Sequence, residues 1–322
     1  MEAAKMQDVL TIGDAMITMN PKQRGPMRFT TEFERKIGGA ELNVAIGCAR
    51  LGLQTGMISR LGRDEFGRHI FNTLRGEGID VSGIALEDNY ATPVNFKETT
   101  ENGNGRTFYY RFPSPTEEIT LQHIKEQLSG QPKVFYITGV FASLRPENVE
   151  MLREVLRFAR EQGVLTAMDP NIRLRLWSRE EAGEAIRSLL PYVDLMLSGR
   201  DEADMLFGVQ SLEEHIASFQ SYGIERVIIK NGSEGAAGKS GSGETVHQSA
   251  EKVEKVADTV GAGDGFNAGF LYGLLQGYPL EKALKIGSAA GAKVVQVAGD
   301  NEGLPLLEEV EAVLGNEERL ER

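Results

Sequence analysis

The sequence is short of cysteine, of basic residues and of long apolar runs. Cys48 is the only cysteine, so no internal disulfide can form, and a reducing cytoplasm is the compartment we expect. No apolar run approaches the ~20 residues of a membrane span, and the polar residues 1–8 contain no apolar signal-peptide core. These absences predict a soluble cytoplasmic protein with no membrane partner.

Positive charge is also scarce. The 322 residues carry 35 Lys and Arg against 47 Asp and Glu, a net charge of −12, which argues against nucleic acid as the main partner. The length suits one large α/β domain with a small appendage. The chain shows no internal repeat, zinc-ligand spacing, Walker A pattern or protein-kinase glycine loop.

What the chain does have is a glycine-rich stretch, DTVGAGDGFNAGF, at residues 258–270. The apolar residues in and after it are typical of a helix, and a Gly-Ala-Gly run at a helix start exposes backbone N–H groups that bind anions, most often phosphate. Asp264 would oppose an anion unless it had a chemical task. Removing a proton from a hydroxyl beside a bound phosphoryl group is such a task. An ordinary turn with Asp264 as helix N-cap explains this spacing equally well.

A second glycine-rich stretch, GGAELNVAIGCARLG, opens another helix at residues 38–52. The two glycines at its start let the backbone approach a ligand closely. Asn43 lies in the first turns, where its amide could hydrogen-bond a hydroxyl. Tight helix packing through Gly and Ala accounts for the same composition, and the two interpretations are compatible.

Short apolar runs alternate with helical patterns along most of the chain, which predicts a parallel, doubly wound sheet. Runs 9–14, 55–62, 133–139, 164–169, 193–197 and 226–230 are typical of strands, and the Ala-rich segment 281–298 of a helix. Polar residues follow several strands, namely Asp14, then Asp169 with Asn171 and Arg173, then Lys230. Open α/β sheets bind ligands beyond the carboxyl ends of their strands, so these are candidate ligand contacts, although Asp14 could merely turn the chain.

Residues 93–112 interrupt this alternation with two β-like runs around the turn ENGNG at 101–105, which predicts a hairpin. The hairpin and the irregular segment 16–37 are expected to form a small lid. Alternation puts Tyr109 and Arg111 on one face, and that pair suits an anionic, hydroxylated small molecule. An exposed amphipathic hairpin or a subunit interface is an equally weighted alternative, and the lid is where we expect a homo-oligomer to form.

With both glycine-rich stretches in the right order and distance, the chain resembles the ribokinase-like carbohydrate kinases of the PfkB family over nearly its whole length. The family's two signatures appear here as GGAELNVA at 38–45 and DTVGAGDGF at 258–266. The resemblance implies an α/β fold with a doubly wound, mostly parallel sheet, flanking helices and a small β lid. It assigns residues 1–13, 38–90 and 113–322 to the nucleotide- and substrate-binding core, and residues 14–37 and 91–112 to the lid.

The same resemblance implies ATP-dependent phosphorylation with Mg²⁺. Asp264 would be the base, and the N–H groups of Gly261, Ala262, Gly263 and Asp264 would form the anion hole. The implied ATP-binding residues are Asn171, Arg173, Lys230, Asn231, Gly232, Ser233, Glu234 and Gly235, together with the anion hole. Glu202 would help to place Mg²⁺, but Gly199 stands three residues before it where the family usually has Asn. Asp258 and Val260 resemble the loop that holds a monovalent cation such as K⁺ in some members.

Within the family the chain is most similar to the 2-keto-3-deoxygluconate kinases, which phosphorylate a terminal hydroxyl of a sugar acid. The similarity rests on FYYR at 108–111, DPNIRLRLW at 169–177 and GDNEGLP at 299–305. The implied substrate contacts are Gly39, Ala40, Glu41, Leu42, Asn43, Tyr109, Arg111, Arg173, Asp264 and Asp300. A sugar carboxylate needs arginine, for which Arg111 and Arg173 are the candidates. Asn95 stands where many of these kinases carry Tyr.

A fructokinase or another sugar kinase of the family is the runner-up, because such enzymes share many of these features. A nucleotide- or sugar-binding protein without catalysis is the alternative from another class. That alternative predicts a missing base or a broken anion hole, and the sequence keeps Asp264, Gly261 and Gly263.

Overall fold

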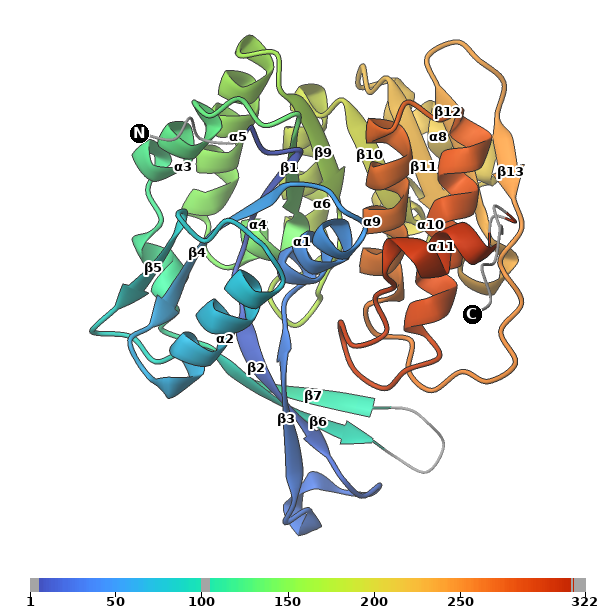
Figure 1. Cartoon of the computed structure of the whole chain (residues 1–322). Coiled ribbons are helices and arrows are strands. Elements are labelled where there is room, and N and C mark those ends of the chain that lie inside the picture. Colours follow the sequence, from blue (N-terminus) through green and yellow to red (C-terminus); the bar gives the residue numbers. More distant parts are fainter. Residues whose placement is uncertain (1–5, 100–104, 314, 316–322) are drawn as a thin grey trace.

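The computed structural model describes residues 6–99, 105–313 and 315, which contain one large and one small β-sheet (Figure 1). In these residues the large sheet has nine strands in the order β13-β12-β11-β10-β9-β8-β1-β4-β5. The strands are β1 (Val9–Ile12), β4 (Thr55–Gly62), β5 (Ile84–Glu87), β8 (Val134–Thr138), β9 (Leu165–Asp169), β10 (Leu195–Gly199), β11 (Arg226–Lys230), β12 (Ala236–Ser240) and β13 (Val246–Gln248). All pairs are parallel except those of β12 with β11 and β13.

Helices cover both faces of this sheet, so its central strands are buried on both sides. In β8, for example, Phe135 and Ile137 pack on one face while Val134 and Tyr136 pack on the other. The first face is covered by α3 (Leu121–Leu128), α4 (Gly139–Ser143), α5 (Glu147–Glu161), α6 (Arg179–Leu189), α7 (Arg200–Phe207) and α8 (Leu212–Gln220). The other is covered by α1 (Ala40–Arg50), α9 (Ala262–Leu275), α10 (Leu280–Val294) and α11 (Leu307–Val313). The structure thus confirms the predicted doubly wound α/β fold.

Helices α9 and α10 lie against each other at unusually short range. A Cβ on Gly269 would lie 2.8 Å from the carbonyl oxygen of Ile286 and 3.0 Å from the Cα of Gly287. Only glycine permits this approach, which packs the middle of α9 closely against α10. The helix expected over 281–298 stops at Val294, and the segment after it turns back to carry Asp300.

The small sheet projects from the main body as a lid (Figure 1). Its strand order is β3-β2-β6-β7, from β3 (Phe33–Gly38), β2 (Met16–Pro21), β6 (Val94–Thr99) and β7 (Gly105–Tyr110). β6 and β7 form the predicted antiparallel pair, while most of the turn expected at 101–105 lies outside the described residues. Helix α2 (Glu65–Gly76) packs near the base of the lid.

The two faces of the lid differ in chemistry, as strand alternation requires. One face presents Asn95, Lys97, Tyr109 and Arg111 toward the main body. On the opposite face the rings of Phe96 and Tyr110 meet edge to face with centroids 5.7 Å apart. Among the described helices, none has both the length and the apolar character needed to cross a bilayer.

Candidate active site

A cleft of about 1440 Å³ lies between the lid and the carboxyl-terminal edge of the large sheet. The ends of four parallel strands reach it, with Asp14 after β1, Asp169 on β9, Gly199 on β10 and Lys230 on β11. The strand order reverses beside β1, because the chain first continues outward to β4 and β5 and later returns to β8 on the other side. Such a reversal point is where open α/β sheets form ligand crevices.

The start of α9 lines this cleft. Gly261 precedes the helix with φ +80°, a conformation that favours glycine. A helix leaves its first N–H groups without intrahelical partners, and here these belong to Ala262, Gly263 and Asp264, of which the Ala262 N–H makes a long bond of 3.4 Å to the carbonyl of Thr259. The ammonium of Lys230 lies beside them, 3.6 Å from where a Cβ on Gly263 would stand. Backbone N–H groups and a lysine therefore converge on one point, as a phosphoryl group requires.

Asp264 lies at this point with 7% of its surface exposed. The side-chain amide of Asn43 donates a hydrogen bond of 2.8 Å to its Oδ2. Burial raises the pKa of Asp264 to about 7, although the Asn43 hydrogen bond and the charges of Arg173 and Lys230 act in the opposite direction. A carboxyl group with a pKa near the working pH is suited to general base catalysis.

Lys230 is itself held by a buried polar network. Its Nζ donates to Asp169 Oδ2 at 2.7 Å and to Asn267 Oδ1 at 3.1 Å. The amide of Asn267 donates in turn to Asp169 and to the hydroxyl of Tyr136. These contacts fix the lysine where it faces the start of α9.

Glu202 is the one predicted metal residue, and it lines the cleft. Its carboxylate oxygens accept hydrogen bonds from the backbone N–H groups of Gly199 and Ile172, at 2.9 and 2.8 Å. Burial, aided by Asp169, raises the pKa of Glu202 to about 7, while Lys230 lowers it. In the described part of the chain, no three His, Cys, Asp or Glu side chains gather into a metal cage. A single carboxylate nevertheless suits Mg²⁺, which proteins commonly bind through one or two carboxylates plus substrate phosphates and water.

The lid end of the cleft is lined by charged pairs. Arg111 forms a buried ion pair with Asp14, and Lys97 forms one with Asp300. The Lys97 ammonium also lies 3.9 Å from Asp258. Burial raises the pKa of Asp300, and Lys97 opposes that rise. Gly39, Ala40, Asn43 and Tyr109 complete the predicted residues at this end.

Four predicted contacts do not line the cleft. Glu41 and Leu42 are fully buried beneath its floor. The Glu41 carboxyl accepts a hydrogen bond from Thr138 and lies under Gly13, where a Cβ would come within 2.3 Å of it. Asn231 and Glu234 bond to each other, at 2.6 Å, rather than facing the cleft. For the rest, Asn171, Arg173, Gly232, Ser233 and Gly235 line the cleft as expected.

Several lining residues escaped the sequence prediction. Lys97 was missed, although it alternates with Asn95 on the cleft face of β6 and the strand pattern could have revealed it. Arg175 was missed too, and its guanidinium donates to the carbonyl of Thr107 in the lid. Another wall of the cleft comes from loop 250–256 and from Ser288, Gly291, Ala292 and Val295. These residues carry no motif, so only the folded chain brings them to the site.

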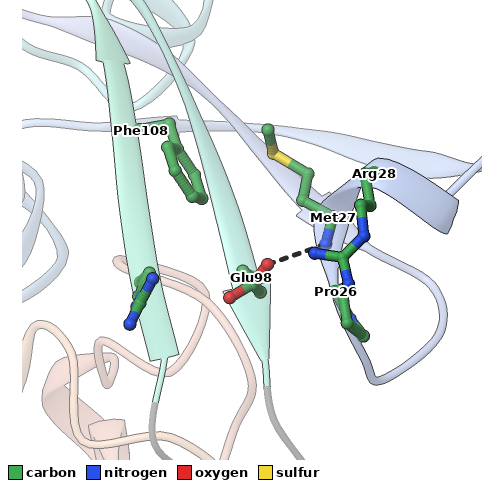
Figure 2. A pocket seen from close by; sticks show the side chains of 6 residues that line it. Pro26, Met27, Arg28, Glu98 and Phe108 are labelled. Carbon is green, nitrogen blue, oxygen red and sulfur yellow. Dashed lines mark hydrogen bonds between the residues drawn. The ribbon is translucent and has the colours of Figure 1, made fainter.

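A second, smaller hollow of about 490 Å³ lies on the lid (Figure 2). It is lined by Pro26, Met27, Arg28, Glu98, Arg106 and Phe108, and Glu98 accepts a hydrogen bond of 2.7 Å from the Met27 N–H. None of these residues lines the cleft. A short 3-10 turn, Met27–Phe29, begins at the hollow, but its first N–H is already bonded to Glu98, and none of the lining residues is buried. The hollow therefore holds no buried base, and the chemistry belongs to the cleft.

Comparisons with known proteins agree with this geometry. The profile of the pfkB family carbohydrate kinases matches residues 6–307. The 2-dehydro-3-deoxygluconokinase of Bacillus subtilis (strain 168) is 32% identical over 309 residues, 95% of each chain. A 5-dehydro-2-deoxygluconokinase of Bacillus licheniformis is 30% identical over 312 residues, again 95% of each chain. The structure of a putative ribokinase II from E. coli in complex with ATP and Mg²⁺ superposes with a TM-score of 0.89 at 25% identity, covering 97% of this chain and 100% of the other.

Proposed function

Because the chain belongs to the pfkB family of carbohydrate kinases, we propose that it transfers the γ-phosphoryl group of ATP to a terminal hydroxyl of 2-keto-3-deoxygluconate, also named 2-dehydro-3-deoxygluconate. Sugar phosphorylation with ATP and Mg²⁺ is the general activity, and the choice of sugar acid is the proposal's specific part. The observation that carries the chemistry is the Asp264 carboxyl, held by Asn43 and placed in the first turn of α9.

In the proposed reaction Asp264 removes the proton of the sugar hydroxyl as that oxygen attacks the γ-phosphorus. The bond between this phosphorus and the bridging oxygen of ADP breaks, and ADP leaves. The N–H groups at the start of α9 and the ammonium of Lys230 stabilise the charge on the transferred group. Catalysis in such phosphoryl transfers is mostly positioning and charge stabilisation.

Glu202 is the residue proposed to hold Mg²⁺ at the nucleotide. The bound ion would neutralise charge on the ATP phosphates. Asn171 and the cleft-lining residues of the 230–235 loop would hold the nucleotide from the sheet side. The K⁺ dependence suggested by Asp258 and Val260 is also part of the proposal, and the test is activity in K⁺ against activity in tetramethylammonium.

The sugar acid is favoured by two observations. Similar proteins are named as kinases of two keto-deoxygluconates. Arg173 lines the cleft beside Asp264, whose pKa it lowers, and among the described residues no carboxylate pairs with it. An arginine that lacks an ion-pair partner suits the carboxylate of a sugar acid. Arg111, the other predicted partner, is already paired with Asp14.

Contacts between the lid and the body would exclude water from the reaction. Lys97 reaches from β6 to Asp300, Lys36 from β3 to the carbonyl of Ala298, and Arg175 from the body to the lid. A closed lid limits the hydrolysis of ATP by water.

The outer face of the lid is the surface we propose for a homo-oligomer. Phe29 and Tyr110 expose 66% and 65% of their surfaces on the lid. The hollow of Figure 2, which Phe108 and Met27 help to line, is also on the lid. A second copy of the chain would cover these aromatic side chains. The reducing cytoplasm, where ATP is abundant, remains the proposed location.

The test is ATP consumption with 2-keto-3-deoxygluconate, 5-keto-2-deoxygluconate, fructose, ribose and adenosine. We expect the highest kcat/KM on 2-keto-3-deoxygluconate. Arg173→Ala is expected to lower kcat/KM on the sugar acid about 10- to 100-fold, as the loss of ~1.5–3 kcal/mol from a charged hydrogen bond implies, with a smaller loss on fructose. A higher kcat/KM on fructose would establish the runner-up, a fructokinase. Equal losses on both sugars would remove the carboxylate argument.

A further inference from the structure

Three buried polar atoms at the lid end of the cleft have no hydrogen-bond partner among the described residues. They are Asp14 Oδ1, Asn95 Oδ1 and Arg111 Nε. All three side chains line the cleft, and their residues are only 1%, 5% and 5% exposed. A buried polar atom without a partner costs about 1–3 kcal/mol, and native proteins keep few of them. Their clustering at a cleft indicates that a bound ligand supplies the partners.

The orientation of the Asn95 amide follows from its neighbours. Its Nδ2 lies 2.9 Å from the sulfur of Met16 and 3.2 Å from the hydroxyl oxygen of Thr18. The methionine sulfur accepts hydrogen bonds but cannot donate. An amide oxygen in that position would face a sulfur that cannot donate, so the nitrogen lies there and Oδ1 is the atom left without a partner. Asn95 therefore offers the ligand a hydrogen-bond acceptor.

The ion pair beside it offers a similar pattern. Asp14 and Arg111 neutralise each other, with side chains 1% and 3% exposed. The atoms they leave free are one acceptor, Asp14 Oδ1, and one donor, Arg111 Nε. A carboxylate brought here would meet two acceptors and one donor whose charge is already neutralised. A hydroxyl both donates and accepts, so it satisfies these atoms where a carboxylate cannot.

We propose that Asn95 determines substrate specificity by accepting a hydrogen bond from one hydroxyl of the sugar, at the lid end of the cleft. The inference rests on the proposed function, and it refines the choice of substrate. 2-Keto-3-deoxygluconate carries hydroxyls on C4, C5 and C6, whereas 5-keto-2-deoxygluconate carries them on C3, C4 and C6. Asn95 thus distinguishes these sugar acids by where their hydroxyls lie, while the carboxylate is left to a cation elsewhere in the cleft.

The experiment pairs substitutions of Asn95 with substrates that each lack one hydroxyl. Asn95→Leu keeps the side-chain size and removes the acceptor, while Asn95→Asp keeps an acceptor oxygen. The control is Asn20→Leu, because Asn20 lies in the same lid sheet, also has an unpartnered Oδ1, and does not line the cleft. We measure kcat/KM of the full chain on the best substrate of the panel and on its deoxy analogues, with the melting temperature of each variant.

We expect one deoxy analogue to react at least tenfold more slowly than the parent sugar with the unchanged protein, because a site built to bond a hydroxyl rejects an analogue that lacks it. Asn95→Leu should lower kcat/KM on the parent sugar by a similar factor and leave that analogue unchanged. Asn95→Asp should retain the discrimination, and Asn20→Leu should leave it intact. If Asn95→Leu does not fold, Asn95→Asp alone tests the proposal. Loss of the discrimination between the parent sugar and its deoxy analogue in that variant would contradict the proposal.

Equal losses on every substrate with Asn95→Leu, or no loss at all, would overturn the inference. Failure of the proposed function has a different signature, because the unchanged protein would then use fructose or ribose in place of a sugar acid. The same coupling between Asn95 and one hydroxyl can still be measured with the deoxy analogues of that sugar.

Discussion

Replacing Asp264 by Asn tests the mechanism at its centre. The change keeps the size of the side chain and removes its ability to take a proton. Because base catalysis contributes typically about 10²- to 10⁴-fold, kcat should fall by at least 100-fold. ATP should still bind, since Lys230 and the N–H groups of α9 remain and a nearby carboxyl group that can become negatively charged has gone.

The same substitution has a calculable effect on stability. At about 1.36 kcal/mol per tenfold change in an ionisation constant, the rise of the Asp264 pKa from 3.8 to about 7 corresponds to a cost of about 4 kcal/mol for ionising this buried group. The folded protein keeps the proton up to about pH 7, whereas the unfolded chain loses it near pH 4. The wild-type protein therefore loses stability as the pH rises between these values, and the Asn variant does not. The variant should melt at a higher temperature at pH 8 and at a similar temperature at pH 4.

The assays are kinase activity across pH 5–9, ATP binding by calorimetry and thermal melting across pH 4–8. In the wild-type protein kcat/KM should rise with pH and level off above about 7, as the free base titrates, and the variant should lack this rise. The matched control is Asp201→Asn, an exposed acid on α7 that should change none of these. A variant within tenfold of wild-type activity would show that Asp264 is not the base, and unchanged melting at pH 8 would contradict the burial argument.

Three further substitutions test the surroundings of the base. Gly261→Ala places a Cβ 2.1 Å from the Asp300 carbonyl oxygen, so kcat and the melting temperature should both fall. The control is Gly208→Ala, because Gly208 has a similar φ of +85° but no atom near the added Cβ, so this change should lower stability alone. Burial raises the pKa of Glu41 to about 8, so ionising this carboxyl destabilises the folded protein at high pH. Glu41→Gln should therefore melt at a higher temperature than the wild type at pH 8.5, and the difference should shrink as the pH falls toward 5. Equal melting temperatures at pH 8.5 would show that the carboxyl is not buried. Lys97→Met breaks the ion pair with Asp300 and should raise sugar-independent ATP hydrolysis relative to sugar phosphorylation. A constant ratio would show that this pair does not hold the lid.

The fold could be predicted because its signals are local. Most strands of the large sheet are short apolar runs, and β4, β8, β9 and β10 are each followed by a helix. The lid hairpin was equally visible, since alternation in residues 108–111 placed Tyr109 and Arg111 together on the cleft face. The contact between Asn43 and Asp264 joins residues 221 positions apart. No local pattern indicates this contact, and it was the resemblance to the PfkB family, carried by both glycine-rich helix starts, that assigned the two residues to one site.

The differences between the predicted site residues and those that line the cleft also have physical causes. In the first turn of α1, Ala40 and Asn43 are three residues apart and face the cleft, while Glu41 and Leu42 point beneath it. Helical spacing could have distinguished the residues that face the cleft from those that are buried. The prediction instead took every residue of the motif as a ligand contact. The wall made by loop 250–256 and α10 depends on tertiary packing alone. The Lys97–Asp300 pair likewise joins residues 203 positions apart, with no pattern in the sequence to indicate it.

The anion site and the base of this cleft form one electrostatic unit. An ATP phosphoryl group that enters beside Asp264 brings negative charge, which by itself would raise the pKa of the carboxyl and weaken it as a base. Lys230 lies against the same helix start and lowers that pKa, so in the proposed mechanism its charge would both attract the phosphoryl group and favour the ionised form of Asp264. Asp169 and Asn267 hold the lysine in place by hydrogen bonds of 2.7 and 3.1 Å. In the proposed mechanism, nucleotide binding and proton removal would thus depend on the position of the same ammonium group.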